Sequence, residues 1–204
     1  HAPRGQITAI TGQNGAGKTT LARCLCGLMK EQSGTIFWDG KPLSRTERRR
    51  KAFLIMQDVN LQLFGDSVLA EIRLGNTATE QEALTTLGRM DLAQYADTHP
   101  MALSGGQKQM LNLASVMAMN PKLLILDEPT SMLDPLAARS LLDTVERINR
   151  ELGVAVLLTE HRLDAVFPVC DRVLVMDGGK VRIDGAPAKI ASQLAQETEK
   201  ERLY

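Results

Sequence analysis

The chain has 204 residues, enough for one full α/β domain with a sizeable core but hardly for two independent domains. Its 24 lysines and arginines balance its 24 aspartates and glutamates, so the sequence offers no broad positive surface for nucleic acid. No apolar run approaches the roughly 18 to 20 residues that span a bilayer, and no leader pattern opens the chain. We therefore expect no membrane span and no nucleic-acid partner.

The three cysteines are an odd number, and their spacing fits no metal site. Cys24 and Cys26 point to different faces of one predicted helix, and Cys170 lies far along the chain. We interpret all three as reduced residues in or near the core of a cytosolic protein.

The first predicted elements are a buried strand over Gln6–Ile10 and a helix over Thr19–Met29. The sequence GQNGAGKTT between them matches the phosphate-binding pattern G-x-x-x-x-G-K-[ST] at every fixed position. Its glycines let successive N–H groups turn toward phosphate oxygens. We expect Lys18 to reach the β- and γ-phosphates of a nucleotide and the Thr19 hydroxyl to bind Mg²⁺. The residues expected to bind ATP are Gly12, Gln13, Asn14, Gly15, Ala16, Gly17, Lys18, Thr19 and Thr20.

The next segment predicts a short strand over Ser33–Gly40, with Ile36 and Trp38 on one face. A basic helix over Leu43–Lys51 follows, and Glu47 interrupts its run of cations. In a chain of zero net charge we interpret this helix as a solvated face without function.

Two apolar runs of strand length end in polar residues, where ligands bind in open α/β sheets. Ala52–Met56 ends at Gln57, and Leu123–Leu126 ends at Asp127 and Glu128. Adjacent carboxylates at the mouth of a buried strand are costly unless they hold a cation or do acid–base work. We predict that Asp127 holds Mg²⁺, directly or through water, and that Glu128 orients and deprotonates the attacking water.

Residues 58–103 predict a small helical insertion, with helices over Val68–Leu74, Glu80–Arg89 and Asp91–Tyr95. The sequence LSGGQ over Leu103–Gln107 then opens a helix that ends near Asn120. Ser104 suits an N-cap, and Gly105 and Gly106 expose backbone N–H groups beside it, so this helix start is a predicted anion site.

The last part of the chain predicts a helix over Leu136–Leu152 and a buried strand over Val154–Leu158. His161 lies just after the end of that strand, as Gln57 and Asp127 lie at the ends of their strands. This position predicts a contact with the γ-phosphate. A β-hairpin over Val173–Met176 and Val181–Ile183 follows, and the tail Gln193–Tyr204 is expected to be helical at first and then frayed.

These motifs, in this order, resemble the nucleotide-binding subunit of ATP-binding cassette (ABC) transporters over nearly the whole chain. The resemblance implies an α/β P-loop NTPase fold, with a mostly parallel sheet flanked by helices and a small helical subdomain. It implies one ABC ATPase domain over 1–204, with an α/β core at 1–57 and 121–204 and a helical subdomain at 58–120 that includes the signature helix. Family members carry two more strands and an adenine-stacking aromatic residue upstream, so we expect the N-terminal antiparallel β portion to be truncated.

The resemblance also implies a role for each motif. The catalytic residues are Lys18, Gln57 (Q-loop), Glu128 (Walker B) and His161 (switch histidine). The metal residues are Thr19, Gln57 and Asp127. Two subunits face each other head to tail, and each lends signature and D-loop residues to the other's ATP, namely Ser104, Gly105, Gly106, Gln107 and Asp134. The implied partners are that second ABC subunit, identical or not, and integral membrane transport subunits at the cytoplasmic face of the cell membrane.

The subfamily rests on fewer residues. Gln57 with Gln62-Leu63-Phe64, and Thr159 to Leu163, are similar to the ATPases of energy-coupling factor (ECF) importers, which take up vitamins or transition-metal ions. Leu61, Leu63 and Phe64 suit either a groove for a membrane subunit's helix or the core of the helical subdomain. Other ABC importers remain open, as does a soluble non-transport ABC ATPase acting on nucleic acid or ribosomes. A P-loop kinase is disfavoured by LSGGQ.

Overall fold

The fold is built on a mostly parallel sheet, as expected from the sequence. The structure is a computed structural model and describes residues 3–193. In this part of the chain the main sheet has the strand order β4-β5-β6-β1-β7-β8. Neighbouring strands are parallel except β7 and β8, which form the predicted antiparallel hairpin. The strands are β1 (Ile7–Gly12), β4 (Ala52–Ile55), β5 (Leu123–Asp127), β6 (Ala155–Thr159), β7 (Arg172–Asp177) and β8 (Lys180–Gly185).

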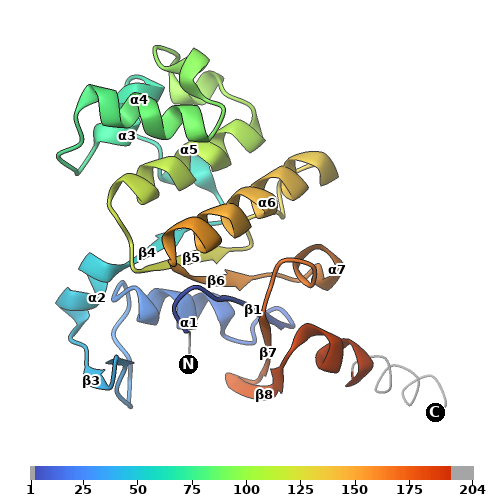
Figure 1. Ribbon diagram of the computed structural model, residues 1–204. Helices are drawn as coiled ribbons and strands as arrows, with labels where there is room; N and C mark the ends of the chain where they lie inside the picture. The colour runs from blue at the N-terminus through green and yellow to red at the C-terminus, as the bar shows by residue number, and fades with distance from the viewer. Residues whose placement is uncertain (1–2, 194–204) are drawn as a thin grey trace.

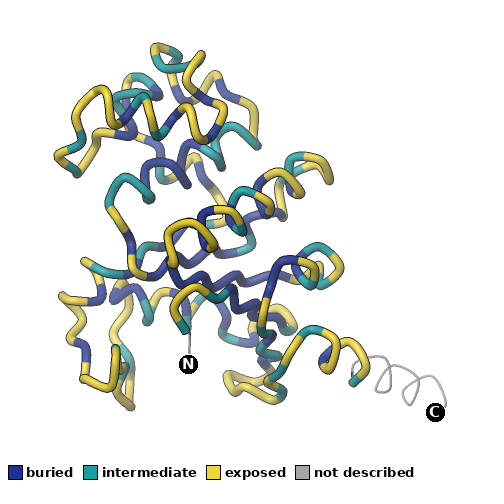
Figure 2. Tube along the Cα trace, in the orientation of Figure 1, coloured by how far each residue is buried: buried dark blue, intermediate teal, exposed yellow. Residues whose placement is uncertain are grey.

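Helices cover both faces of this sheet (Figure 1). Along β5, Leu124 and Leu126 belong to a core shared with α5 (Gly105–Ala118) and α6 (Pro135–Leu152). Ile125, between them, belongs to the core shared with α1 (Lys18–Leu25) on the other face. The apolar runs of β5 and β6 are therefore buried on both sides, as Figure 2 shows along the sheet, because successive strand residues point to opposite faces.

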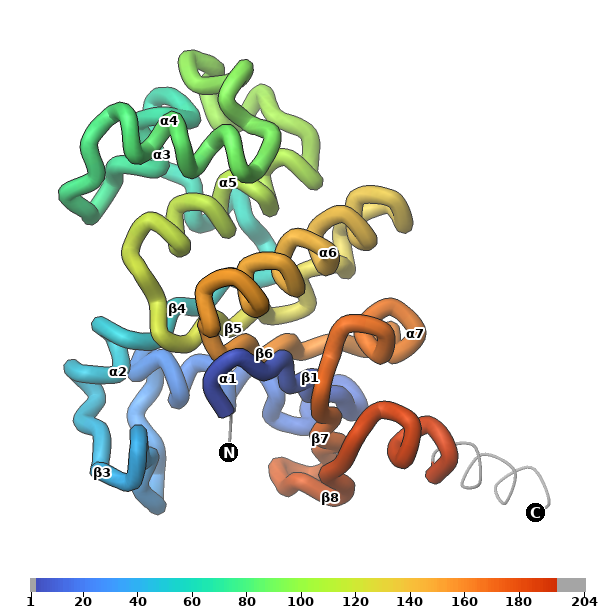
Figure 3. The backbone as a smooth tube through the Cα atoms, in the orientation of Figure 1, coloured from blue at the N-terminus to red at the C-terminus, as the bar shows by residue number. Residues whose placement is uncertain are grey.

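A helical segment lies beyond α5, away from the sheet (Figure 3). It contains α3 (Val68–Arg73) and α4 (Glu80–Arg89), both in contact with α5. Three short 3₁₀ turns complete it: η1 (Val59–Leu61), η2 (Ala93–Tyr95) and η3 (Pro100–Ala102). The division into a core at 1–57 and 121–204 and a helical subdomain at 58–120 stays a prediction.

Several predicted boundaries are wrong. The helix expected over Asp91–Tyr95 is only the 3₁₀ turn η2, and the first strand is shifted to Ile7–Gly12. The first helix ends at Leu25 rather than Met29, because Gly27 adopts a left-handed φ of 70°. A Cβ on Gly27 would lie 2.5 Å from the carbonyl oxygen of Arg45, so the chain must turn here with glycine. The strand expected over Ser33–Gly40 shortens to β2 (Phe37–Trp38), which pairs with β3 (Lys41–Pro42).

The basic helix α2 (Arg45–Lys51) is mostly exposed, as its composition suggests, but it buries one arginine. Arg48 is 1% exposed, and its guanidinium donates to both carboxylate oxygens of Glu31, at 3.2 and 2.6 Å. It also donates to the carbonyl oxygen of Leu43 at 3.3 Å. The solvated interpretation is therefore wrong for Arg48, which is a structural residue of the core.

The C-terminal part is described only to residue 193. Residues 187–193 are helical, and the rest of the predicted tail, 194–204, lies outside the described residues. The short helix α7 (Leu163–Val166) follows β6. Within 3–193, no helix combines the length and the apolar character needed to cross a membrane.

Candidate functional site

The phosphate loop joins the end of β1 to the start of α1. Gly12, Gly15 and Gly17 have φ values of 149°, 81° and 96°, which favour glycine. A Cβ on Gly12 would lie 2.1 Å from the carbonyl oxygen of Met176, whereas one on Gly15 would meet nothing within 4 Å. The loop thus packs tightly on β7 at its base and is open at its centre, where phosphate oxygens are expected to bind.

Lys18 lies folded onto this loop. Its side-chain ammonium donates to the carbonyl oxygens of Gly12 at 2.9 Å and Gln13 at 3.2 Å. Lys18 is 5% exposed, so these bonds satisfy a charge that would otherwise be costly to bury. The Nζ atom also lies 3.3 Å from Nε2 of His161, which belongs to the segment after β6.

Asp127 is a buried carboxylate with two hydroxyl donors. The strand register places it opposite Thr159, whose Oγ1 donates to Asp127 Oδ1 at 2.6 Å. Thr19 Oγ1, at the first turn of α1, donates to the same oxygen at 3.2 Å. Two of the three predicted metal residues, Thr19 and Asp127, therefore meet at one point beside the phosphate loop.

These oxygens fit Mg²⁺, which prefers carboxylate, hydroxyl and phosphate ligands. Among residues 3–193, no group of three or more His, Cys, Asp or Glu side chains could hold a metal ion by itself.

Glu128 and His161 form a direct pair. Glu128 has a left-handed φ of 49°, and its N–H donates to the carbonyl oxygen of Thr159 at 3.0 Å and to its hydroxyl at 3.1 Å. Its Oε1 lies 2.8 Å from Nε2 of His161. We assign the proton to Nε2, because an ionised carboxylate can only accept, so the approach of Lys18 Nζ to this atom is a contact between two donors and not a hydrogen bond. The site therefore brings three predicted catalytic side chains together: Lys18, Glu128 and His161.

Gln57 joins this group through one intermediate residue. Its Nε2 donates to Ser131 Oγ at 3.2 Å, and Ser131 Oγ donates to the carbonyl oxygen of Glu128 at 2.8 Å. The described contacts of the Gln57 side chain thus lead to the turn that follows β5. Its metal role stays a prediction.

The signature residues begin α5. Ser104 and Gln107 form a capping box, in which Ser104 Oγ accepts from the Gln107 N–H at 3.3 Å and Gln107 Oε1 accepts from the Ser104 N–H at 2.8 Å. A Cβ on Gly106 would lie 3.1 Å from that of Ala137, so this glycine also has a packing reason. Ser104 and Gly105 are exposed.

Asp134, the other residue predicted to act in trans, caps the next helix. Its Oδ1 accepts from the N–H groups of Leu136 and Ala137 at the start of α6. The contribution of Asp134 and of the signature residues to a second subunit stays a prediction.

The sequence interpretation missed several polar residues that hold the site. Thr159 bonds to Asp127 and Glu128, and Glu160 bonds to Thr130 in the turn after β5. The available signal was the run of polar residues after the apolar strand β6, but their partners depend on strand register.

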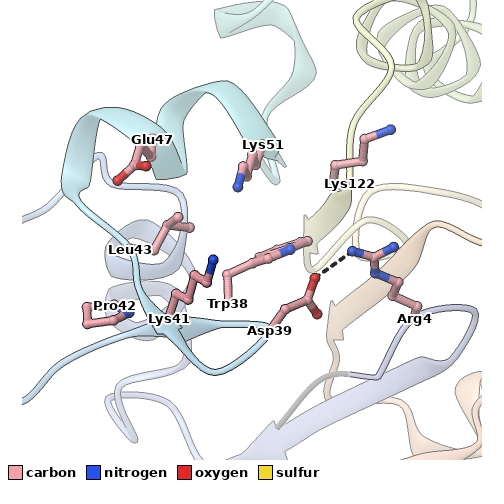
Figure 4. A pocket seen from close by; sticks show the side chains of 9 residues that line it. All are labelled: Arg4, Trp38, Asp39, Lys41, Pro42, Leu43, Glu47, Lys51 and Lys122. Atoms are coloured by element: carbon pink, nitrogen blue, oxygen red, sulfur yellow. Dashed lines mark hydrogen bonds and ion pairs between the residues drawn. The ribbon is translucent and has the colours of Figure 1, made fainter.

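Two cavities lie away from the phosphate loop. One, of about 490 Å³, is lined by Trp38 and by four cations that Figure 4 draws around it, Arg4, Lys41, Lys51 and Lys122. Lys51 Nζ lies 5.6 Å from the Trp38 ring centroid. The other, of about 770 Å³, has an apolar floor that includes Ile10 and Leu157. No predicted site residue lines either cavity, so we assign them no part in phosphate chemistry.

A phosphate loop between β1 and α1, with adjacent carboxylates at the end of a parallel strand, defines a P-loop NTPase. The family model described as "ABC transporter" matches residues 1–131. The chain belongs to this family and has its ATPase fold.

Several known proteins are similar to the chain. An ABC transporter ATP-binding protein of Treponema denticola is 44% identical over 178 residues, covering 87% of this chain and 36% of its own length. The methionine import ATP-binding protein MetN of Haemophilus ducreyi is 37% identical over 211 residues, covering 96% and 61%. The chain therefore spans between about a third and two thirds of the length of these relatives.

Solved structures agree on the fold. The structure of cbiO1 from Clostridium perfringens, part of the ABC transporter complex cbiONQ, matches with a TM-score of 0.85 and 34% identity, covering 93% of this chain and 80% of that one. The ADP conformation of MJ1267, an ATP-binding cassette of an ABC transporter, matches with a TM-score of 0.81 at 23% identity, which supports the fold alone.

Proposed function

We propose that this chain is the ATP-binding and ATP-hydrolysing subunit of an ABC-type importer and couples ATP-driven closure of two such subunits to movement of membrane subunits. The observation that carries the proposal is the cluster beside the phosphate loop. The Lys18 ammonium lies 3.3 Å from His161, and His161 lies 2.8 Å from the Glu128 carboxylate. A cation, a ring N–H and a general base at one point suit hydrolysis of a phosphoanhydride.

Each of these residues has a task in hydrolysis. Lys18 exchanges the carbonyl oxygens of the loop for oxygens of the β- and γ-phosphates. Glu128 orients a water molecule and takes its proton as the water oxygen bonds to the γ-phosphorus. The bond from that phosphorus to the bridging oxygen breaks, and the products are ADP and phosphate. His161 donates its Nε2 proton as a hydrogen bond to the γ-phosphate and orients Glu128.

Magnesium is the proposed cofactor, and Thr19 and Asp127 would hold it. When bound, Mg²⁺ neutralises charge on the phosphate oxygens during transfer. Gln57 is the third proposed metal residue, and it reaches the Glu128 turn through Ser131. The side-chain carbonyl oxygen of Gln57, not its Nε2, would be the atom that binds the metal, and closure around ATP would bring it there.

A second subunit completes the proposed site. At the exposed start of α5 the Ser104 N–H already donates to Gln107 Oε1, so the N–H groups of Gly105 and Gly106 are the ones from which a phosphate of the opposing subunit would accept. Asp134 would contribute from the start of α6. A single subunit should therefore bind ATP but hydrolyse it poorly.

The membrane partner would dock at the segment after Gln57. Leu61 is 61% and Phe64 is 77% exposed, whereas Leu63 is buried. The carboxylate of Glu71 accepts from the N–H groups of Phe64 at 2.7 Å and Gly65 at 2.6 Å, so the loop holds the Phe64 ring out toward solvent. Leu61 and Phe64 support the docking interpretation, and Leu63 supports the core interpretation.

The proposed subfamily is the ECF type, which implies uptake of vitamins or transition-metal ions. Its support is the likeness of Gln62 to Phe64 and of Thr159 to Leu163 to that type, together with the similarity to cbiO1. Methionine import is the second candidate, because the MetN proteins are 37 to 39% identical to the chain. Purification with the membrane subunits, followed by substrate-binding assays, would separate the two. In either case the chain would act at the cytoplasmic face of the cell membrane.

The proposal is tested by Glu128→Gln, which keeps the size of the side chain and removes the base. We expect ATP binding to persist, hydrolysis to fall at least about 100-fold, and an ATP-bound dimer to accumulate. Glu151→Gln, at an exposed position of α6, is the matched control and should hydrolyse ATP like the wild type. Normal turnover in Glu128→Gln would remove Glu128 from its proposed role.

A further inference from the structure

The ends of β5 and β6 are joined by a buried carboxylate that the hydrolysis step does not use. Glu160 is 2% exposed, and its Oε1 accepts from both the N–H and the hydroxyl of Thr130, at 3.0 and 2.6 Å. Its Oε2 accepts from the N–H of His161 at 3.2 Å. One carboxylate thus holds the turn after Glu128 and the backbone of His161 at the same time.

Arg162 completes this arrangement from the surface. Its guanidinium donates to the carbonyl oxygen and to the hydroxyl oxygen of Thr130, both at 2.8 Å. The Thr130 hydroxyl therefore accepts from Arg162 and donates to Glu160. Because Thr130 is fully buried, the hydroxyl links a cation to a carboxylate where water does not compete.

The turn that is held in this way carries a strained residue. Glu128 is a non-glycine residue at φ 49°, a backbone conformation that persists where the surroundings impose it. Thr159 fixes the N–H of Glu128, and Ser131 fixes its carbonyl. Thr130 lies two residues after Glu128 and next to Ser131, so its bonds to Glu160 and Arg162 hold the same turn.

We propose that Glu160, Thr130 and Arg162 form a positioning relay that keeps the Glu128 carboxylate and the His161 ring in register for hydrolysis. All three are positioning residues, because their described bonds run to one another and to the backbone rather than into the phosphate loop. The inference rests on the proposed ATPase function. It adds that the residues after β6, the strand that precedes His161, set the position of the general base Glu128.

The test replaces one hydroxyl. Thr130→Val has nearly the same shape but loses the hydroxyl bond to Glu160 and one bond from Arg162, while its N–H still donates to Glu160; Thr130→Ser keeps the hydroxyl. Thr8→Val is the matched control: Thr8 is fully buried on β1, and its hydroxyl has no hydrogen-bond partner among the described residues. Loss of hydrogen bonds to charged groups should lower kcat about 10- to 100-fold in Thr130→Val.

The split between kinetic constants distinguishes positioning from damage to the fold. We expect the KM for ATP to change less than about twofold, because the bonds of the phosphate loop are untouched. Thr130→Ser should restore kcat to within about threefold of the wild type, and Thr8→Val should leave it unchanged. A wild-type kcat in Thr130→Val, or an equal loss in Thr130→Ser, would overturn the relay.

A second measurement does not depend on turnover. Hydrogen exchange of the amides of Glu128, Thr130 and Ser131 should be faster by about tenfold or more in Thr130→Val than in Thr8→Val, because the turn opens more easily. A wild-type chain that binds but never hydrolyses ATP, even as a dimer, would contradict the proposed function. The hydrogen-exchange measurement would then test the relay without any turnover. Unchanged exchange at these amides would overturn the relay alone.

Discussion

Replacing Lys18 by methionine should change the unfolding free energy of the nucleotide-free protein only slightly but should strongly reduce the stabilisation that ATP provides. Without nucleotide the variant loses the bonds from Nζ to Gly12 and Gln13, but it also avoids burying a charge. These effects oppose each other, so we expect the unfolding free energy to change by no more than about 1 to 2 kcal/mol.

The nucleotide-bound state should change much more. ATP at 100 times its Kd stabilises the wild type by about 2.7 kcal/mol, or roughly 5 to 11 °C in Tm for a chain of this size. A charged hydrogen bond of about 1.5 to 3 kcal/mol is lost from the phosphates, so affinity falls roughly 10- to 100-fold. At the same ATP concentration the gain drops to about 0.4 to 1.4 kcal/mol.

The assay is thermal unfolding with and without MgATP. Lys30→Met, an exposed lysine after α1, is the control and should keep the full ATP-dependent shift in Tm. If Lys18→Met kept the full shift as well, the proposed contact of Lys18 with the phosphates would be refuted.

Three further predictions test other parts of the structure. Arg48→Met should lower the unfolding free energy by about 1 to 3 kcal/mol in chemical denaturation, and exposed Arg50→Met by less than about 0.5. Burial raises the pKa of the Cys26 thiol from 9.0 to about 12, so iodoacetamide at pH 8 should label Cys24 before Cys26. The contribution of the neutral Cys26 thiol to the unfolding free energy should be full below pH 9 and should fall as the pH rises toward 12. Ser104→Arg should abolish hydrolysis yet keep the ATP-dependent Tm shift, and retained hydrolysis would argue against a shared site.

The sequence predicts elements best where a local signal is complete. The helix Glu80–Arg89 has both predicted ends, because Thr79 and Glu82 form a capping box at its start. The helix after the phosphate loop is overestimated, since its end depends on the close approach of Gly27 to Arg45, two residues from different elements. Such a contact leaves no trace in the local pattern of apolar residues.

In the site, too, residues set by a local motif are predictable, whereas contacts between distant segments are not. Lys18 and Asp127 are predictable because their chemistry demands a fixed residue at a fixed place in a strand–loop–helix context. The bond from Thr159 to Asp127 requires the register of two strands that are 32 residues apart. Arg48 was misinterpreted because a run of cations is usually solvated, and its burial depends on Glu31 being near enough to pair with it.

The side chain of Gln62 connects the site to the helical segment. Gln62 Oε1 accepts from the Met56 N–H at 2.7 Å and from Asn112 Nδ2 at 3.0 Å, and its Nε2 donates to the carbonyl oxygen of Leu54 at 2.9 Å. One amide therefore ties the end of β4, beside Gln57, to the middle of α5. Because Ser104 caps the helix that contains Asn112, we expect the Gln62 bonds to couple a shift at the end of β4 to a shift of the signature residues.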